Sequence, residues 1–184
     1  MAVADRRDGG GTRHEHTRTH GPSHLGSVLA REDEMKKEFS HWESWSNRAA
    51  LAGLSYPGVY ALVISPTNIA AAAFSWRQEI VYVGMTNAKG GLKSRLQQFD
   101  NTIQGRDGHG RAHRVRYKHN DYTKLNSQLY VSVCPWDCDV TSIRPADLRL
   151  MGEVEKYEYE CFALFVEKFG VLPEFNDKKK SLKK

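Results

Sequence analysis

The sequence predicts an α/β (α+β) domain in which helices pack on a short sheet. Three β-rich runs alternate with helical segments, in the order helix, strand, strand, helix, strand, helix. The 184 residues are enough to bury a core, and 40% apolar against 27% charged residues excludes a fully disordered polymer. No window approaches the roughly 18 consecutive apolar residues of a membrane span, and the N-terminus lacks a secretory apolar core. Three cysteines are too few and too odd in number for a disulfide scaffold, so we expect a soluble, cytoplasmic protein without membrane contact.

The N-terminal part of the chain divides into two segments. Residues 1–30 are rich in Gly, Arg, His and Thr without an apolar period, and we expect a disordered basic, His-rich arm. Residues 31–54 have apolar residues at three- and four-residue steps, which predicts an amphipathic helix whose aromatic stripe packs on the main body. The stripe consists of Met35, Phe39, Trp42, Trp45 and Ala49.

The later elements follow from β-rich and amphipathic runs between turn signals. Their predicted bounds are Val59–Ser65, Glu79–Gly84 and Gln128–Cys134 for strands, and Leu92–Phe99 and about Ala146 to Phe169 for helices. The first two strands are joined by a loop, so an antiparallel pair is expected. Pro145 begins the last helix and Gly170 ends it.

Positive charge is concentrated in two places. The chain has 27 Lys and Arg against 22 acidic residues, a net charge of +5. A loop at 105–124 holds six Lys or Arg against two Asp, and the Lys-rich tail at 177–184 holds five Lys against one Asp. Binding of a polyanion is one interpretation of this pattern, and a solvated loop and tail is the other.

Two tyrosines beside glycines are the first candidate site residues. They stand in Gly58-Val59-Tyr60 and in Tyr82-Val83-Gly84, where backbone can approach a ligand closely. Antiparallel pairing of the two strands would bring both phenols to the same end of the sheet. Arg95 follows on the next helix, beside its apolar stripe.

Five segments carry a family resemblance in order: PGVYALVIS, IVYVGMT, LKSRLQQF, a late Glu-bearing helix and PEFN, over residues 57–176. Together they resemble the GIY-YIG nuclease superfamily. The resemblance implies a small three-stranded antiparallel sheet flanked by helices for a nuclease domain at 55–176. It also implies hydrolysis of DNA phosphodiester bonds with one Mg²⁺, for which Mn²⁺ would substitute.

Matched by motif, the resemblance implies roles for four residues. Tyr60, or Tyr82 assisting it, would take a proton from the attacking water, because a nearby cation favours an ionised phenol. Arg95 would stabilise charge on the transferring phosphate. Asn176 is the closing asparagine of the catalytic set, with a positional role.

A carboxylate must hold the metal ion, and the last helix offers several. At about 100° per residue, Glu158 lies inside the apolar arc of this helix, where a carboxylate is costly unless it binds something. The family's Glu is followed by apolar residues three, four and seven positions on, and Glu158 matches this better than Glu160. We expect Glu158 to hold Mg²⁺, with Glu160 as second candidate; a Glu at the helix rim bonded to a neighbour is the structural alternative.

The chain departs from the family pattern at two points. The connection between Tyr60 and Tyr82 is longer than usual, which implies an inserted loop, and Phe99 stands where some relatives carry a histidine. His109 or His113 is a substitute proton carrier, a phosphate contact or plain surface. Candidates for DNA contacts in the basic loop are Arg111, His113, Arg114 and Arg116.

The leading hypothesis is a metal-dependent DNA endonuclease of the restriction or defence/repair type. Few residues follow Asn176, which argues against a homing enzyme with an added DNA-binding region. Restriction-type cutting favours a homodimer, because two-fold symmetric sites mirror protein symmetry. The alternative is a non-catalytic nucleic-acid-binding module on the same fold; a metal- or protein-binding scaffold leaves the Tyr, Tyr, Arg and Glu series unexplained.

Overall fold

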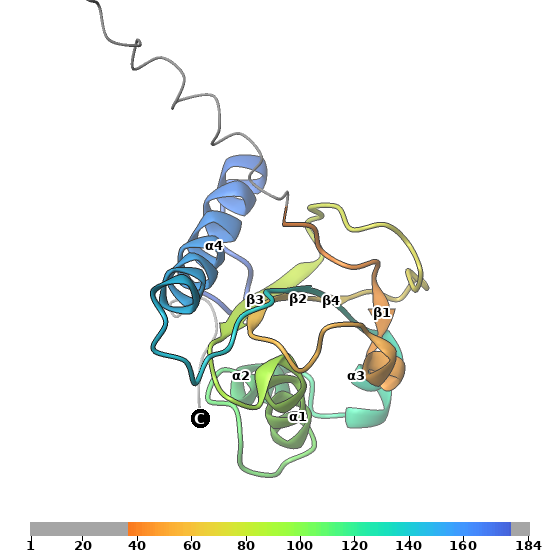
Figure 1. The fold of residues 1–184 in the computed structure, drawn as a ribbon. Coiled ribbons are helices and arrows are strands. Elements are labelled where there is room, and N and C mark those ends of the chain that lie inside the picture. The colour runs from red at the N-terminus through yellow and green to blue at the C-terminus, as the bar shows by residue number, and fades with distance from the viewer. Residues whose placement is uncertain (1–36, 178–184) are drawn as a thin grey trace, which may run out of the picture. The chain divides into compact units, whose positions relative to one another are not determined.

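A four-stranded antiparallel sheet with helices on both faces forms the centre of the computed structural model, which describes residues 37–177 (Figure 1). The strands lie in the order β1-β4-β2-β3, with bounds β1 Glu43–Ser44, β2 Gly58–Ile64, β3 Ile80–Thr86 and β4 Leu129–Pro135. The α+β prediction is confirmed. The strand number is four rather than three, because the two residues of β1 pair with β4.

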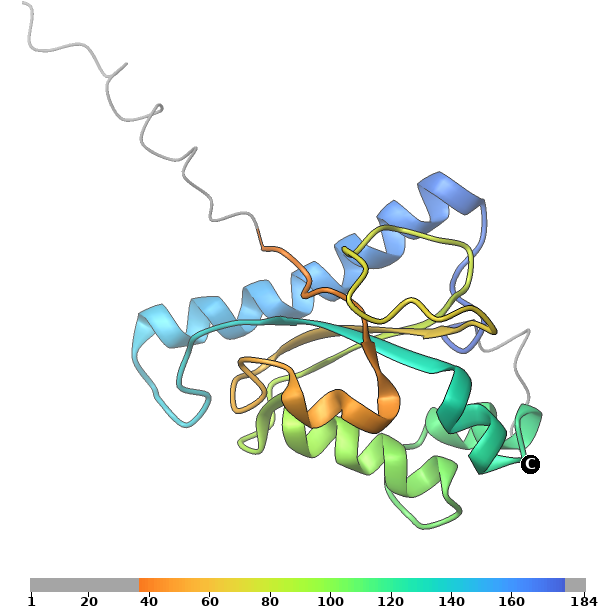
Figure 2. The same cartoon turned by 90° about the vertical axis from the view of Figure 1, so that its right-hand side faces the viewer.

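Strand β2 is the centre of the sheet, paired antiparallel with β3 on one side and β4 on the other. Its first six residues are buried, because both faces of the sheet are covered. Helix α4 (Pro145–Phe169) covers one face, and α1 (Gly91–Ile103), α2 (Ala112–Lys118) and α3 (Tyr122–Gln128) cover the other, as the two views show (Figures 1 and 2).

Alternation along β2 divides the core into two clusters. Val59, Ala61 and Val63 belong to the cluster that α4 covers. Tyr60 and Leu62 belong to the cluster under α1, α2 and α3. Because successive side chains of a strand point to opposite faces, Tyr60 lies on the α1 face, opposite to Val59 and Ala61.

The strands and long helices lie close to their predicted bounds, and Gly170 ends α4 in the left-handed conformation, with φ of 72°. No helix within residues 37–177 is long and apolar enough to cross a membrane. The predicted basic loop at 105–124 contains α2 and the start of α3. Ala112 and Val115 of α2 are buried in the α1-side cluster, and the Asp121 side chain caps α3 by accepting from the Lys124 N–H at 3.0 Å.

The predicted amphipathic helix at 31–54 is wrong over its described part. Residues 31–36, the predicted arm at 1–30 and the predicted tail beyond Asp177 lie outside the described residues. Residues 37–42 are not helical, β1 follows, and Trp45–Ala50 form a 3₁₀ helix, η3. Trp42 packs in the α4-side cluster and Trp45 in the α1-side cluster. One helix would place residues three apart on the same face, so it could not deliver both indoles. Backbone hydrogen bonds of Trp42 with Ala71 and Ala72, at 2.8 and 2.9 Å, hold the extended conformation instead.

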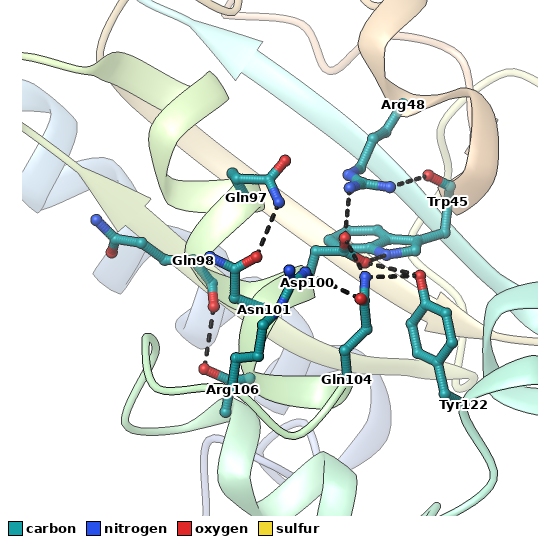
Figure 3. Close-up of polar contacts among 10 residues, drawn as sticks. Trp45, Arg48, Gln97, Gln98, Asp100, Asn101, Gln104, Arg106 and Tyr122 are labelled. Carbon is teal, nitrogen blue, oxygen red and sulfur yellow. Dashed lines mark hydrogen bonds and ion pairs between the residues drawn. The ribbon is translucent and has the colours of Figure 1, made fainter.

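Asp100 on α1 is a buried carboxylate that joins η3 and α3 to this helix (Figure 3). One oxygen accepts from the Trp45 indole at 2.7 Å and from the Tyr122 hydroxyl at 3.1 Å. The other lies 2.8 Å from the Arg48 guanidinium and accepts from Gln104 at 2.7 Å. A buried charge is tolerated when it is paired and hydrogen-bonded in this way.

We expect Asp100→Ala to lower the free energy of unfolding by roughly 3 kcal/mol, because the substitution leaves several buried donors and a guanidinium without their acceptor. Urea denaturation followed by tryptophan fluorescence measures this change. Asp107→Ala is the control, since Asp107 is exposed; its effect should stay within about 0.5 kcal/mol. Equal stability of the two variants would contradict the structural role of Asp100.

Candidate active site

Tyr60 and Tyr82 lie together on the α1 face of the sheet. Tyr60 of β2 pairs with Gly84 of β3, two residues after Tyr82, so both phenols stand over the same stretch of backbone. The two ring centroids are 5.8 Å apart, and both side chains are buried. The expected convergence of the two phenols is present.

Gly84 makes room for this pair of phenols. A Cβ at Gly84 would lie 2.8 Å from the hydroxyl oxygens of both Tyr60 and Tyr82, and 2.7 Å from a ring carbon of Tyr82. The space that the glycine leaves is therefore occupied by the protein's own side chains, whereas the sequence suggested space for a ligand.

Arg95 on α1 adds positive charge next to the phenols. Burial raises the pKa of Tyr60 well above its ordinary value, and the Arg95 charge opposes that shift. The same balance, with Arg111 added to the opposing charges, leaves the pKa of Tyr82 raised. The Arg95 Nε is buried and has no hydrogen-bond partner among residues 37–177. A guanidinium nitrogen in this state is suited to bind an anionic oxygen.

Glu158 on α4 reaches the same region. Burial raises its pKa, while the charges of Arg111 and Arg95 and a backbone hydrogen bond with Met85 oppose the rise. The charge of Glu158 in turn raises the pKa of Tyr82. Glu160 is exposed. Burial is the main cause of the raised pKa of Tyr157 and of Cys161 in the α4-side cluster; the Glu160 charge adds to both shifts, and the Glu158 charge adds to that of Cys161. Of the two candidate carboxylates, the structure brings Glu158 to the motif residues.

Asn176 braces the outer edge of β3. Its side-chain oxygen accepts from the Val83 N–H, and its amide nitrogen donates to the Val83 carbonyl, both at 2.8 Å. The Phe175 N–H donates to the Val81 carbonyl at 2.9 Å. These bonds flank Tyr82 in sequence, so Asn176 acts on the site by positioning the strand.

His109, from the segment before α2, is a site residue that the sequence left undecided. It is 1% exposed, and its Nε2 lies 3.1 Å from the Tyr60 hydroxyl. Its ring packs edge-on against Tyr82 and Phe99. Burial lowers its pKa to about 3, with the Arg95 charge adding to the effect. No periodicity marks this segment, and only the flanking glycines of Gly108-His109-Gly110 hint at a special conformation.

The predicted DNA-contact residues do not form one uniform surface. Arg111 is exposed, and its charge opposes the rise in the pKa of Glu158 that burial causes. It therefore lies at the rim of the site. Arg114 is half-buried and donates to the Asp177 carbonyl at 3.4 Å. Arg116 is exposed, and His113 is half-buried near His109.

The residues at this site fit a metal ion only if the ion takes a single carboxylate from the protein and keeps several waters. Within the described part of the chain, no three His, Cys, Asp or Glu side chains gather as a multi-ligand metal site. Glu158 is a single, partly desolvated carboxylate among phenols and guanidiniums. Mg²⁺ suits such a position, since it keeps several waters and takes few protein ligands.

No known family model matches the chain, and neither a curated protein nor a solved structure matches it. The assignment of the site therefore depends on convergence. Four elements and one loop contribute to the edge of β3 the residues Tyr60, Tyr82, Arg95, His109 and Glu158.

We expect Gly84→Ala to destabilise the protein by about 1–3 kcal/mol, because its methyl group would displace two buried phenols. Gly152→Ala is a matched control in α4, where a Cβ meets nothing within 4 Å. This control should stabilise by about 0.5–1 kcal/mol, since alanine favours a helix interior. Urea denaturation distinguishes the two signs, and a neutral Gly84→Ala would contradict the packing described.

We expect His109 to make stability depend on pH. Its pKa is about 3 in the folded protein and near 6.5 in an unfolded chain, so the unfolded chain binds one more proton between these values. Stability should therefore fall as the pH drops from about 6 to 4, by up to roughly 1.4 kcal/mol per pH unit from this residue. Urea denaturation at several pH values should give a smaller slope for His109→Gln than for the wild type. Equal slopes would contradict the lowered pKa, because they would mean that His109 binds as many protons in the folded protein as in the unfolded chain.

Proposed function

We propose that the chain is a metal-dependent DNA endonuclease of the GIY-YIG type. The observation that carries the proposal is the convergence of two phenols, a guanidinium and a carboxylate on the edge strand β3. Partly buried ionisable groups with perturbed pKa values are typical of active sites. In support, the Arg95 Nε is a buried donor with no hydrogen-bond partner among residues 37–177, and such a donor could bind an anionic oxygen.

In this proposal Tyr60 accepts the proton of the attacking water at its hydroxyl oxygen. Burial outweighs the Arg95 charge in the free protein, so the phenol is protonated there. Before Tyr60 can act as a base it must release this proton to bulk solvent, a step that further positive charge would favour. A Mg²⁺ ion held by Glu158 and waters, or Mn²⁺ in its place, would supply that charge and polarise the phosphate. Arg95 stabilises the negative charge on the transferring phosphate through its planar fork.

The DNA backbone would approach from the side of α2. Arg111 at the rim and the exposed Arg116 are available for phosphate contacts. His113 and Arg114 are more buried, and Arg114 is engaged with the C-terminal segment, so we assign them smaller parts in DNA binding. A restriction or defence/repair role, a homodimer and an intracellular setting complete the proposal.

The test is cleavage of supercoiled plasmid and of short duplexes with Mg²⁺ or EDTA. Glu158→Gln and Arg95→Ala should each bind DNA but lose cleavage by about 100-fold or more, because each removes charge complementary to the transition state. Glu160→Gln is the matched control on the same helix and should cleave like the wild type. Salt-sensitive DNA binding by the wild type without any scission would contradict the proposal and support the non-catalytic binding module.

A further inference from the structure

We propose that His109 is a positioning residue for Tyr60: fixed as the Nε2-protonated tautomer, it donates a hydrogen bond to the phenol oxygen and does not carry protons. The inference deepens the proposed function and rests on it for the role of Tyr60. The tautomer itself follows from hydrogen-bond geometry alone.

The Nδ1 atom of His109 fixes the tautomer. It lies 3.2 Å from the backbone nitrogen of Arg111 and 3.2 Å from that of Ala112, and both N–H groups donate to it. An imidazole nitrogen that accepts hydrogen bonds bears no proton, so the proton of the neutral ring is on Nε2. Nε2 is the atom 3.1 Å from the Tyr60 oxygen, and it must be the donor of that bond.

The backbone seats His109 firmly in this position. Its N–H donates to the Thr102 hydroxyl at 2.6 Å, which ties the segment to α1. A Cβ at Gly108 would lie 2.5 Å from the Gln98 carbonyl oxygen and 2.8 Å from the Thr102 hydroxyl. Only a glycine lets the segment lie this close to the helix, so the approach of His109 to Tyr60 is built into the chain.

The charges around the ring also keep it neutral. The groups facing His109 are Arg95 of α1, Arg111 at the start of α2, and His113 within it, and each disfavours a second proton on the ring. The groups facing Tyr60 are Tyr82 of β3, Arg95 and His109. Protonation at Nδ1 would also set an N–H against two backbone donors. The Nε2 of His109 therefore stays a hydrogen-bond donor to Tyr60, and the ring stays neutral, between pH 5 and pH 8.

This arrangement directs the proton of Tyr60. Because its oxygen accepts from His109, its own hydrogen points elsewhere, and the Tyr82 hydroxyl is a hydrogen-bond partner within reach. A donor fixed on the phenol oxygen favours the ionised phenol and holds the ring in one orientation. His109 thus prepares Tyr60 to accept a proton without accepting one itself.

Imidazole ¹⁵N NMR tests the tautomer without any need for activity. The His109 ring should show a protonated Nε2 and an unprotonated Nδ1, unchanged between pH 8 and pH 5. In Tyr60→Phe the Nε2 resonance should shift, because it loses its acceptor, while Nδ1 stays the same. A proton on Nδ1, titration of the ring in this range, or an unmoved Nε2 resonance in Tyr60→Phe would each overturn the inference.

Two substitutions test the catalytic consequence. Asn can replace the Nδ1 acceptor but offers no donor to Tyr60, whereas Gln can extend an amide donor toward it. We expect His109→Asn to lower kcat by about 10–100-fold with KM and the acid limb of the pH profile unchanged, and His109→Gln to recover most of that loss. Equal losses in both variants, or an altered acid limb, would contradict the positioning role. Absence of cleavage by the wild type would refute the endonuclease, while the ¹⁵N result would still decide the tautomer.

Discussion

The anchoring of β3 along both of its edges is the constraint on which the candidate site depends. An edge strand normally exposes a row of unpaired backbone groups. Here β2 pairs with the inner edge, and Phe175 and Asn176 hydrogen-bond to the outer edge at Val81 and Val83. Tyr82 lies between these two anchored residues. Because the bracing segment follows α4 directly in the chain, the helix that carries Glu158 is tied to the same strand.

The site and the scaffold use helix α1 in different ways. The charge of Arg95 opposes the rise in pKa that burial causes at the phenols. Asp100, five residues later, instead joins η3 and α3 to the helix through hydrogen bonds and an ion pair. Burial favours the neutral forms of Tyr60, Tyr82 and Glu158; the Arg95 charge opposes this at all three groups, and the Arg111 charge opposes it at Tyr82 and Glu158. A site balanced in this way responds strongly to added positive charge, which is what a metal-dependent reaction requires.

Much of this arrangement could be predicted from local patterns, because strand alternation and helical phase are properties of the sequence itself. Antiparallel pairing was sufficient to bring Tyr60 to Tyr82, and the phase of α4 selected Glu158 over Glu160. The helix predicted from the N-terminal aromatic residues was wrong, because their three- and four-residue spacing also occurs in this extended segment. Only the backbone hydrogen bonds of the segment with distant residues decide against the helix. His109 could not be placed, because the segment that carries it is fixed by contacts with α1 and follows no period.

Paramagnetic broadening by Mn²⁺ in amide NMR spectra tests most directly whether a cation site exists at the edge of β3. Mn²⁺ should broaden the signals of Tyr82, Met85 and Glu158 first, and Glu158→Gln should abolish this effect while the protein stays folded. Broadening centred on the exposed carboxylates Asp137 and Asp139, or broadening at β3 that persists in Glu158→Gln, would contradict the account.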